Sequence, residues 1–117
     1  MQNKIKVGLI GAGHLGRYHI NHLSKHSDID FVGFFDTDQE NAKQVASKFS
    51  VKSFEGFNQL IDSVDAVHIV TPTNTHYEIA KKCLNKNKDV FIEKPITKNT
   101  KEACDIIDIA EKNNRII

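Results

Sequence analysis

The sequence has 117 residues, with sixteen Lys and Arg against fifteen Asp and Glu and a net charge of +1. This length predicts a single domain that can bury a core, and the near-neutral charge argues against nucleic acid or an anionic membrane surface as a partner. The apolar stretch after Lys6 is short and interrupted by glycines, so it predicts neither a secretory signal nor a membrane span, which needs roughly 18 apolar residues. We expect a cytoplasmic protein.

Strand-like and helix-like patterns alternate along the chain. Continuous apolar runs predict buried strands, and apolar residues at i, i+3, i+4 and i+7 predict helices. The expected elements are, in order, a strand at 4–10, a helix at 15–25, a strand at 31–35, a helix at 38–49, a short strand at 51–54, a helical turn at 57–62, a strand at 66–70, a helix at 76–84, a strand at 90–92, a helix from about 100 to 110 and the start of a sixth strand at 115–117.

Strands that alternate with helices form right-handed βαβ units around a parallel sheet. Apolar runs that are continuous, not alternating, agree with a sheet covered on both faces. We predict an α/β fold with a doubly wound parallel sheet, a Rossmann fold, over residues 1–117. Two helices are expected to begin with capping pairs, Thr37 with Glu40 and Asn99 with Glu102.

The glycines after the first strand follow G-x-G-x-x-G spacing in "GAGHLG", at Gly11, Gly13 and Gly16. Between a strand and a helix, the first glycine permits the tight turn, the second lets a diphosphate approach the backbone, and the third lets the helix pack closely. The backbone N–H groups around His14 and Leu15 would then face the phosphates at the positive end of the helix dipole. The motif predicts a dinucleotide-binding turn.

An acidic residue, Asp36, ends the second strand, where a carboxylate can accept hydrogen bonds from the adenosine ribose. The residues after it, 37–40, include no Lys or Arg to neutralise a 2′-phosphate, and Asp38 and Glu40 add negative charge. We therefore predict NAD as the cofactor, in preference to NADP, although Arg17 on the first helix could compensate partly. An S-adenosylmethionine-dependent methyltransferase also pairs a glycine-rich loop with an acid after the second strand, and this alternative stays open at this point.

Two further stretches, "VTPTNTH" (70–76) and "FIEKP" (91–95), follow the fourth and fifth strands. Together with "GAGHLGRYH", they resemble the glucose–fructose oxidoreductase / inositol dehydrogenase (Gfo/Idh/MocA) family over the whole chain. The Thr-Pro…His and Glu-Lys-Pro stretches are more specific than the glycine motif alone and have no place in a methyltransferase.

The resemblance implies roles for residues beyond the glycine turn. Thr71, Pro72 and Thr73 would line the path of the cofactor, His76 would lie near the nicotinamide half, and Glu93 would lie close to the nicotinamide ribose. A packing role for His76 stays open, because its helical face points inward. All these residues follow strand ends, where ligands bind in open α/β sheets.

Lys94 would face the substrate as the catalytic residue implied by the resemblance. An ammonium group near a reacting carbonyl or alkoxide stabilises developing negative charge and can relay a proton. The expected activity is that of an NAD-dependent dehydrogenase that transfers hydride to or from a sugar, a cyclitol or a related small molecule, in a homo-oligomer. A non-catalytic dinucleotide-binding sensor or partner subunit is the alternative.

In this family a second, mixed-sheet domain follows and supplies most substrate contacts. No such segment follows residue 117 here, so we expect a part of a longer protein that ends within the sixth strand and is inactive alone.

The remaining histidines and the cysteines carry separate expectations. His19 and His22 share a helical face with apolar residues and are expected to be half-buried and hydrogen-bonded, whereas the sequence predicts no function for His68 inside a strand. Cys83 and Cys104 lie on apolar faces of expected helices, which predicts buried free thiols. No cluster of His, Cys, Asp and Glu predicts a metal site.

Overall fold

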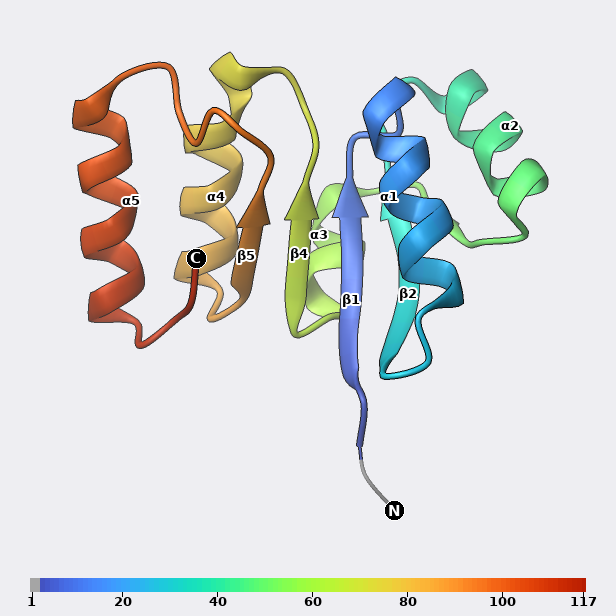
Figure 1. Cartoon of the computed structure of the whole chain (residues 1–117), viewed down its shortest axis with the longest axis horizontal. Coiled ribbons are helices and arrows are strands. Elements are labelled where there is room, and N and C mark those ends of the chain that lie inside the picture. The colour runs from blue at the N-terminus through green and yellow to red at the C-terminus, as the bar shows by residue number, and fades with distance from the viewer. Residues whose placement is uncertain (1–2) are drawn as a thin grey trace.

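A computed structural model describes residues 3–117. It contains one sheet of five parallel strands in the order β3-β2-β1-β4-β5 (Figure 1). The elements are β1 (Ile5–Ile10), α1 (His14–Lys25), β2 (Ile29–Phe35), α2 (Gln39–Phe49), β3 (Ser53–Phe54), α3 (Phe57–Asp62), β4 (Ala66–Ile69), the 3₁₀ turn η1 (Thr73–Thr75), α4 (His76–Asn85), β5 (Asp89–Ile92) and α5 (Thr100–Lys112).

Helices cover both faces of this sheet, with α1 in front of it and α3 behind it in Figure 1. On the first face, Leu9 and Phe34 pack with Val45 of α2 in one apolar cluster. On the other face, Ile69 packs with Leu84 of α4 in a second cluster to which α3 and α5 also contribute. The predicted doubly wound α/β fold is confirmed, because helices cover both faces of the sheet and β1 and β2 contribute side chains to both cores.

The strand order places a topological switch point between β1 and β4. After β1 the chain proceeds to β2 and β3, whereas after β4 it proceeds to β5 on the opposite side. Connections that leave neighbouring strands in opposite directions open a crevice at the carboxyl ends of those strands. This crevice is where the glycine turn and the segment after β4 meet.

The two predicted capping pairs have different outcomes. The Asn99 side chain accepts a hydrogen bond from the Glu102 amide over 2.9 Å, as predicted. The prediction for Thr37 is wrong, because Asp38 is the N-cap of α2 and its carboxylate accepts from the Asn41 amide over 3.1 Å. The first helical residue is therefore Gln39, one position later than the apolar spacing alone indicated.

The two cysteines also differ. Cys83 is a buried free thiol on α4, as predicted, and burial raises the pKa of its thiol to about 12. Cys104 is exposed, so the prediction of a buried thiol is wrong there. The buried stripe of α5 follows Ile106 and Ala110 toward α4, and Cys104 lies off this stripe by about half a helical turn.

Residues 115–117 lie beside the edge of β5 without forming a regular strand. The Val90 amide donates to the Ile116 carbonyl oxygen, and the Ile116 amide donates to the Asp89 carboxylate, both over 2.9 Å. None of the helices within residues 3–117 has the length and apolar character needed to cross a bilayer.

Candidate functional site

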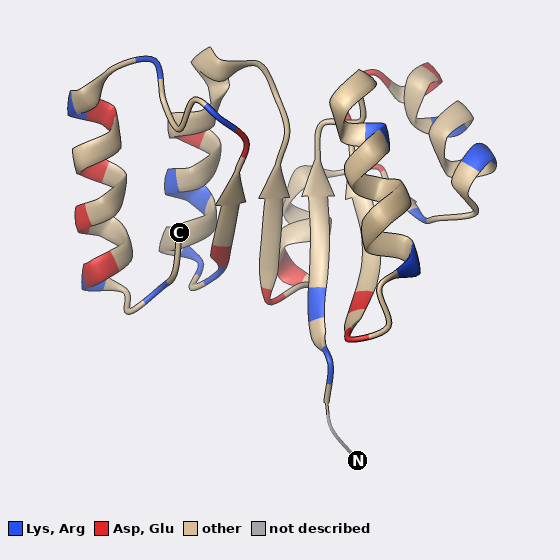
Figure 2. Cartoon of the chain, in the orientation of Figure 1, with Lys and Arg blue, Asp and Glu red and all other residues tan. Residues whose placement is uncertain are grey.

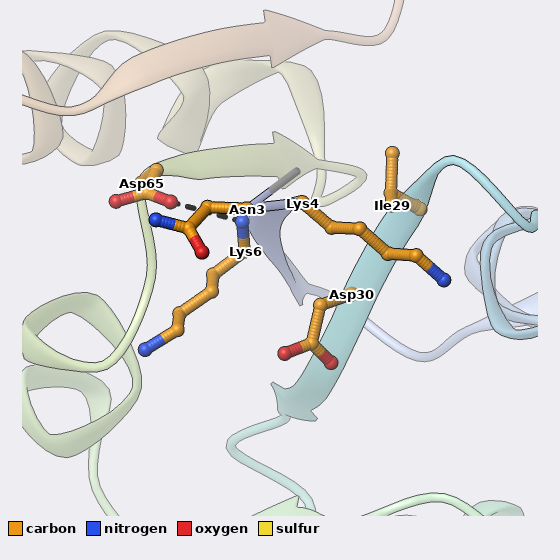
Figure 3. A pocket seen from close by; sticks show the side chains of 6 residues that line it. All are labelled: Asn3, Lys4, Lys6, Ile29, Asp30 and Asp65. Carbon is orange, nitrogen blue, oxygen red and sulfur yellow. Dashed lines mark hydrogen bonds between the residues drawn. The ribbon is translucent and has the colours of Figure 1, made fainter. Parts of the chain in front are cut away.

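Two depressions lie at opposite edges of the sheet. One, of about 630 Å³, lies at the amino ends of the strands, where the Asp65 carboxylate accepts from the Lys6 amide over 2.9 Å (Figure 3). Figure 3 shows Lys4 and Asp30 around it, so its lining mixes both charges. Ligands of parallel sheets bind outside the carboxyl ends of the strands, and this depression therefore lies at the wrong edge.

The other depression, a cleft of about 640 Å³, lies at the carboxyl ends and at the switch point. It brings together residues from both sides of the crevice that the sequence had singled out separately. Its lining includes Gly11, Gly13, His14, Leu15, Gly16, Asp36, Thr71 and Pro72, together with Val70, Phe57, Thr75, Ile79 and Lys82. We take this cleft as the candidate site.

The glycine turn is shaped by contacts that only glycine allows. Gly11 has a φ of 99°, and a Cβ atom there would overlap the Val70 carbonyl oxygen. A Cβ atom on Gly16 would overlap the Gly11 carbonyl oxygen, so α1 packs directly on the turn. Gly13 has open space around the position of a Cβ atom. The turn is thus compact at its two ends and open toward the cleft in its middle.

The start of α1 faces this open space. Gly13 is the N-cap, and within residues 3–117 no side chain caps the helix and no acidic residue occupies its first turn. The first N–H groups of an α-helix have no partner within the helix and carry the positive end of its dipole. His14 and Leu15 line the cleft here, so the site offers backbone donors suited to an anionic group.

The Asp36 carboxylate connects the end of β2 to the glycine turn. Its Oδ2 atom accepts from the Ala12 amide over 2.9 Å, and its Oδ1 atom accepts from the Asp38 amide over 2.8 Å. Asn41 reinforces this link, since its Nδ2 donates to the Ala12 carbonyl oxygen over 2.8 Å and lies 3.3 Å from Asp36 Oδ2. Arg17 in turn donates to Asn41 Oδ1 over 2.7 Å.

Asn41 is a site residue that the sequence reasoning missed. An Asn in the first turn of a helix is ordinarily a solvated side chain, and nothing in the spacing distinguishes this one.

The segment after β4 contributes Thr71 and Pro72 to the cleft, and η1 contributes Thr75. The Thr75 hydroxyl donates to the Pro72 carbonyl oxygen over 2.6 Å and is hydrogen-bonded to the Thr71 hydroxyl over 2.7 Å. Thr73 begins η1 and lies outside the cleft lining. The sequence reasoning did not predict Thr75 as a site residue, although its hydroxyl holds the cleft-facing segment at Thr71 and Pro72 in place.

His76 lies beneath the cleft and not in its wall. Its ring is buried, with Nε2 at 2.9 Å from the Thr71 carbonyl oxygen and Nδ1 at 3.0 Å from the Pro95 carbonyl oxygen. A carbonyl oxygen can only accept, so a neutral ring donates to one of these oxygens and an imidazolium donates to both. This position agrees with the packing alternative, because the ring joins the segment after β4 to the segment after β5.

Glu93 and Lys94 directly follow β5, outside the cleft lining. The Glu93 amide donates to the Ile69 carbonyl oxygen over 3.1 Å, which extends the pairing of β4 and β5 by one residue. Glu93 Oε2 lies 3.0 Å from His19 Nε2, and Oε1 accepts from the Lys94 amide over 3.3 Å. Lys94 is exposed beside this carboxylate.

The structure also shows the surroundings of the three histidines on α1 and β4, namely His19, His22 and His68. His19 is half-buried and hydrogen-bonded, as predicted, whereas His22 is exposed and that prediction is wrong, because it lies on the outer side of α1. His68 points to the α1 face of the sheet, where its Nδ1 lies 3.3 Å from His19 Nδ1. Burial, and secondly His19, lower the pKa of His68 to about 4.

The surface carries both charges. Figure 2 shows Lys and Arg interspersed with Asp and Glu over the helices and loops. Around the site, the carboxylates of Asp36 and Glu93 lie on the same edge of the sheet as Lys82 and Lys94. Within residues 3–117, no group of three His, Cys, Asp or Glu side chains is arranged to hold a metal ion.

The sequence and the fold have close counterparts among known proteins. The chain is 36% identical to the UDP-N-acetylglucosamine 3-dehydrogenase of Acidithiobacillus ferrooxidans, over 97% of this chain and 36% of that protein. A solved structure of that dehydrogenase superposes with a TM-score of 0.89, over 98% of this chain and 38% of that one. The myo-inositol 2-dehydrogenase of Thermotoga maritima is 29% identical, over 97% of this chain and 35% of that protein.

A 3-ketoreductase from Actinomadura kijaniata, solved with NADP and TDP-benzene, has 25% identity and a TM-score of 0.89, over 98% of this chain and 37% of that one. The chain thus spans about a third of the length of the relatives it matches. The sequence pattern of the Gfo/Idh/MocA oxidoreductase family, which has an NAD-binding Rossmann fold, matches residues 5–117. The chain therefore belongs to the Gfo/Idh/MocA family of oxidoreductases, as its sequence motifs indicated.

Proposed function

We propose that this chain binds NAD(H) in the cleft between β1 and β4 and forms the cofactor-binding domain of a dehydrogenase. The observation that carries the proposal is the convergence of two groups on one cleft of about 640 Å³: the uncapped start of α1 and the Asp36 carboxylate. Donors for a diphosphate and an acceptor for a ribose are what a dinucleotide requires at this position.

The diphosphate is assigned to the glycine turn. Gly13 leaves room for phosphate oxygens to reach the N–H groups of His14 and Leu15. Gly11 and Gly16 act indirectly, because their close contacts fix the turn in the shape that keeps this room open. A bound diphosphate would also satisfy the backbone donors that the helix leaves free.

The adenosine half is assigned to Asp36 and the apolar wall of the cleft. Phe57 and Ile79 provide an apolar surface for the base, next to the carboxylate that accepts from the ribose hydroxyls. A 2′-phosphate would meet the negative charge of Asp36 and Asp38, while Arg17, the nearest cation on α1, is held by Asn41. NAD is therefore preferred over NADP, although the structure of the 3-ketoreductase relative was solved with NADP.

The reactive half is assigned to the segments after β4 and β5. Thr71, Pro72 and Thr73 would follow the cofactor toward Glu93, the partner of the nicotinamide ribose. When bound, the nicotinamide supplies the centre that donates or accepts hydride. Lys94 is the catalytic residue of the proposal: its exposed ammonium group would stabilise charge on the substrate oxygen. His76 would act on this half through the backbone segments that it joins.

The substrate class follows from the relatives. Their names specify a nucleotide sugar and a cyclitol, so we propose a hydroxyl or carbonyl group on a sugar, cyclitol or related small molecule. Because the relatives are about three times as long, we further propose that most substrate contacts come from another domain of the whole protein.

The free thiol of buried Cys83 agrees with a cytoplasmic location. A homo-oligomer is supported by the large side chain of Phe91 on β5, which is exposed. Light scattering that finds only monomers at high concentration would contradict an oligomer formed through this side chain.

Calorimetry with NAD, NADP and S-adenosylmethionine tests the proposed function. We expect NAD to bind at least about tenfold more tightly than NADP, which corresponds to about 1.4 kcal/mol, and S-adenosylmethionine not to bind. The double variant Asp36→Ser, Thr37→Arg should shift the preference toward NADP. Equal affinities for the two dinucleotides in the wild type, or tighter binding of S-adenosylmethionine, would contradict the assignment of Asp36.

A further inference from the structure

Three titratable side chains from separate parts of the chain form a continuous row on the α1 face of the sheet. His68 on β4 lies with its Nδ1 atom 3.3 Å from Nδ1 of His19 on α1. His19 Nε2 lies 3.0 Å from Oε2 of Glu93, which follows β5. Glu93 Oε1 then accepts from the Lys94 amide. The row therefore runs from the interior of the sheet to the residue assigned to catalysis.

The chemistry of the partners determines where the hydrogens lie. A carboxylate only accepts, so His19 Nε2 must carry a hydrogen toward Glu93. The contact between the two Nδ1 atoms needs one hydrogen. When His19 is neutral this hydrogen is on His68, and when His19 is an imidazolium it is on His19. The two rings therefore cannot both be protonated and keep this contact, because two N–H groups would then face each other.

The surroundings of His68 favour the neutral ring. The Phe91 ring stacks on it with a centroid distance of 4.5 Å and an interplanar angle of 12°. Burial, and secondly the neighbouring His19, lower the pKa of His68 to about 4. The other carboxylate of β5, that of Asp89, lies at the far end of the strand, where it accepts from the Ile116 amide. His19 on α1 is thus the titratable group of this row that faces His68, and Glu93 contacts the other ring nitrogen of His19.

The side chains of this row are largely buried, as expected of residues that hold one another in a fixed position. The side chains of His19 and Glu93 are only 16% and 23% exposed, so their contact is shielded from competing water. A hydrogen bond to a charged group in such a site contributes roughly 1.5–3 kcal/mol, more than a neutral one. Loss of the hydrogen bond from His68 would leave His19 free to turn about its side-chain bonds.

We propose that His68 is a positioning residue: its neutral ring holds His19 so that the Nε2 hydrogen of His19 fixes the Glu93 carboxylate and, through it, the backbone at Lys94. The functional meaning of this arrangement rests on the proposed function of Glu93 and Lys94. The arrangement itself depends only on the contacts among the four residues. It assigns a role to the one strand histidine for which the sequence predicted none.

Two substitutions at His68 separate hydrogen bonding from packing. His68→Asn places a side-chain amide where Nδ1 of the ring was and keeps a polar partner for His19, whereas His68→Leu fills the strand position without one. Nitrogen NMR of the imidazole rings and of the Lys94 amide reports the arrangement without any cofactor. Turnover of the whole protein and the dissociation constant of NAD report its functional effect.

In the wild type we expect the nitrogen spectrum to show a protonated Nε2 on His19 and a neutral His68 at pH 7. In His68→Leu, the Lys94 amide resonance should shift or broaden and kcat should fall about tenfold, while NAD affinity changes less than about threefold. His68→Asn should restore the resonance and keep kcat within about threefold of the wild type.

Several results would overturn the proposal: a His68→Leu spectrum identical to that of the wild type at His19 and Lys94, or a His68→Asn variant as impaired as His68→Leu. Circular dichroism shows whether His68→Leu is folded, and if it is not, His68→Phe gives the same test, because it keeps an aromatic ring beside Phe91 without a hydrogen-bonding partner for His19. Failure of NAD to bind, with the wild-type spectrum as expected, would contradict the proposed function and leave the positioning row intact.

Discussion

The Asp36 carboxylate accepts the amide hydrogen of Ala12 over 2.9 Å and thereby joins the end of β2 to the turn between β1 and α1. The same carboxylate faces the cleft. One side chain thus both supports the glycine turn and presents the acceptor proposed for the ribose. The amides of Ala12 and Asp38 orient this carboxylate at the wall of the cleft.

Replacing Asp36 with Asn should weaken both the fold and NAD binding. The amide has one oxygen for two backbone donors, the amides of Ala12 and Asp38, so one of them loses its partner. We expect the free energy of unfolding to fall by about 1–3 kcal/mol and NAD affinity to fall at least about tenfold. Urea unfolding and calorimetry measure the two effects.

Asp38→Asn is the matched control for this change. It removes the same charge two residues away, and Asn caps a helix about as well as Asp. We expect its stability to change by less than about 0.5 kcal/mol and its NAD affinity to stay within about twofold. Equal losses in the two variants would show that overall charge, and not the contacts of Asp36, controls binding.

The glycine turn predicts opposite effects for two alanine substitutions. Gly16→Ala places a methyl group on the Gly11 carbonyl oxygen, so we expect a loss of about 2 kcal/mol or more in the free energy of unfolding. Gly13→Ala has open space and should cost less than about 1 kcal/mol, yet it should weaken NAD binding about tenfold or more. Thermal unfolding and calorimetry of both variants test this. Unchanged NAD affinity in Gly13→Ala would remove the diphosphate from the turn.

The features that the sequence predicted are those carried by local spacing. The glycine turn, Asp36 and the alternation of strands and helices each depend on residues close in the chain or on the fixed geometry of βαβ units. Asn41 and Thr75 were missed because their roles depend on which way one side chain points from an ordinary helical or turn position. Contacts such as that of His19 with Glu93, 74 residues apart, exist only once the sheet places β5 near α1.

The wrong predictions concern which residue caps a helix and which side of a helix faces the core. Asp38 replaces Thr37 as the N-cap because both residue types can cap, and apolar spacing does not decide between neighbours. Cys104 and His22 were assigned to buried faces, but each helix buries only a narrow stripe. Cys104 lies about half a helical turn from this stripe on α5, and His22 lies on the outer side of α1. His68 could not be interpreted in advance because its strand neighbours, Val67 and Ile69, face the opposite core.

The lowered pKa of His68 predicts a loss of stability in mild acid. The unfolded chain binds a proton at this histidine near its ordinary pKa of 6.5, whereas the folded chain binds it only near pH 4. Between these values the unfolded state carries more protons, so the free energy of unfolding falls as the pH falls. Above pH 6.5 and below pH 4 the contribution is constant.

Urea unfolding of the wild type and of His68→Phe at several pH values between 7 and 4 measures this contribution. The difference in unfolding free energy, wild type minus variant, should decrease as the pH is lowered through this window. His22→Gln removes an exposed histidine from α1, and its stability curve should run parallel to that of the wild type. A constant difference for His68→Phe would mean that the ring is not protected from protonation by the fold.

Lys94→Ala should separate catalysis from cofactor binding in the whole protein. Lys94 is exposed after β5, its amide is held by Glu93, and its side chain lies outside the cleft lining assigned to the dinucleotide. Its ammonium group matters most when negative charge develops on the substrate oxygen, so its loss acts on the transition state more than on the bound ground state. We expect kcat to fall about 100-fold or more, with the dissociation constant of NAD within about threefold of the wild type. Lys98→Ala is the control, because Lys98 lies in the same segment and its exposed side chain pairs with Glu102 over 3.8 Å. Surface pairs of this kind contribute about 1 kcal/mol or less. Steady-state kinetics and calorimetry of the wild type and the two variants test this prediction. A Lys94→Ala protein that loses NAD affinity but keeps its kcat would place Lys94 at the cofactor and not at the substrate. A Lys98→Ala protein whose kcat falls equally would assign the effect to the charge of the whole segment.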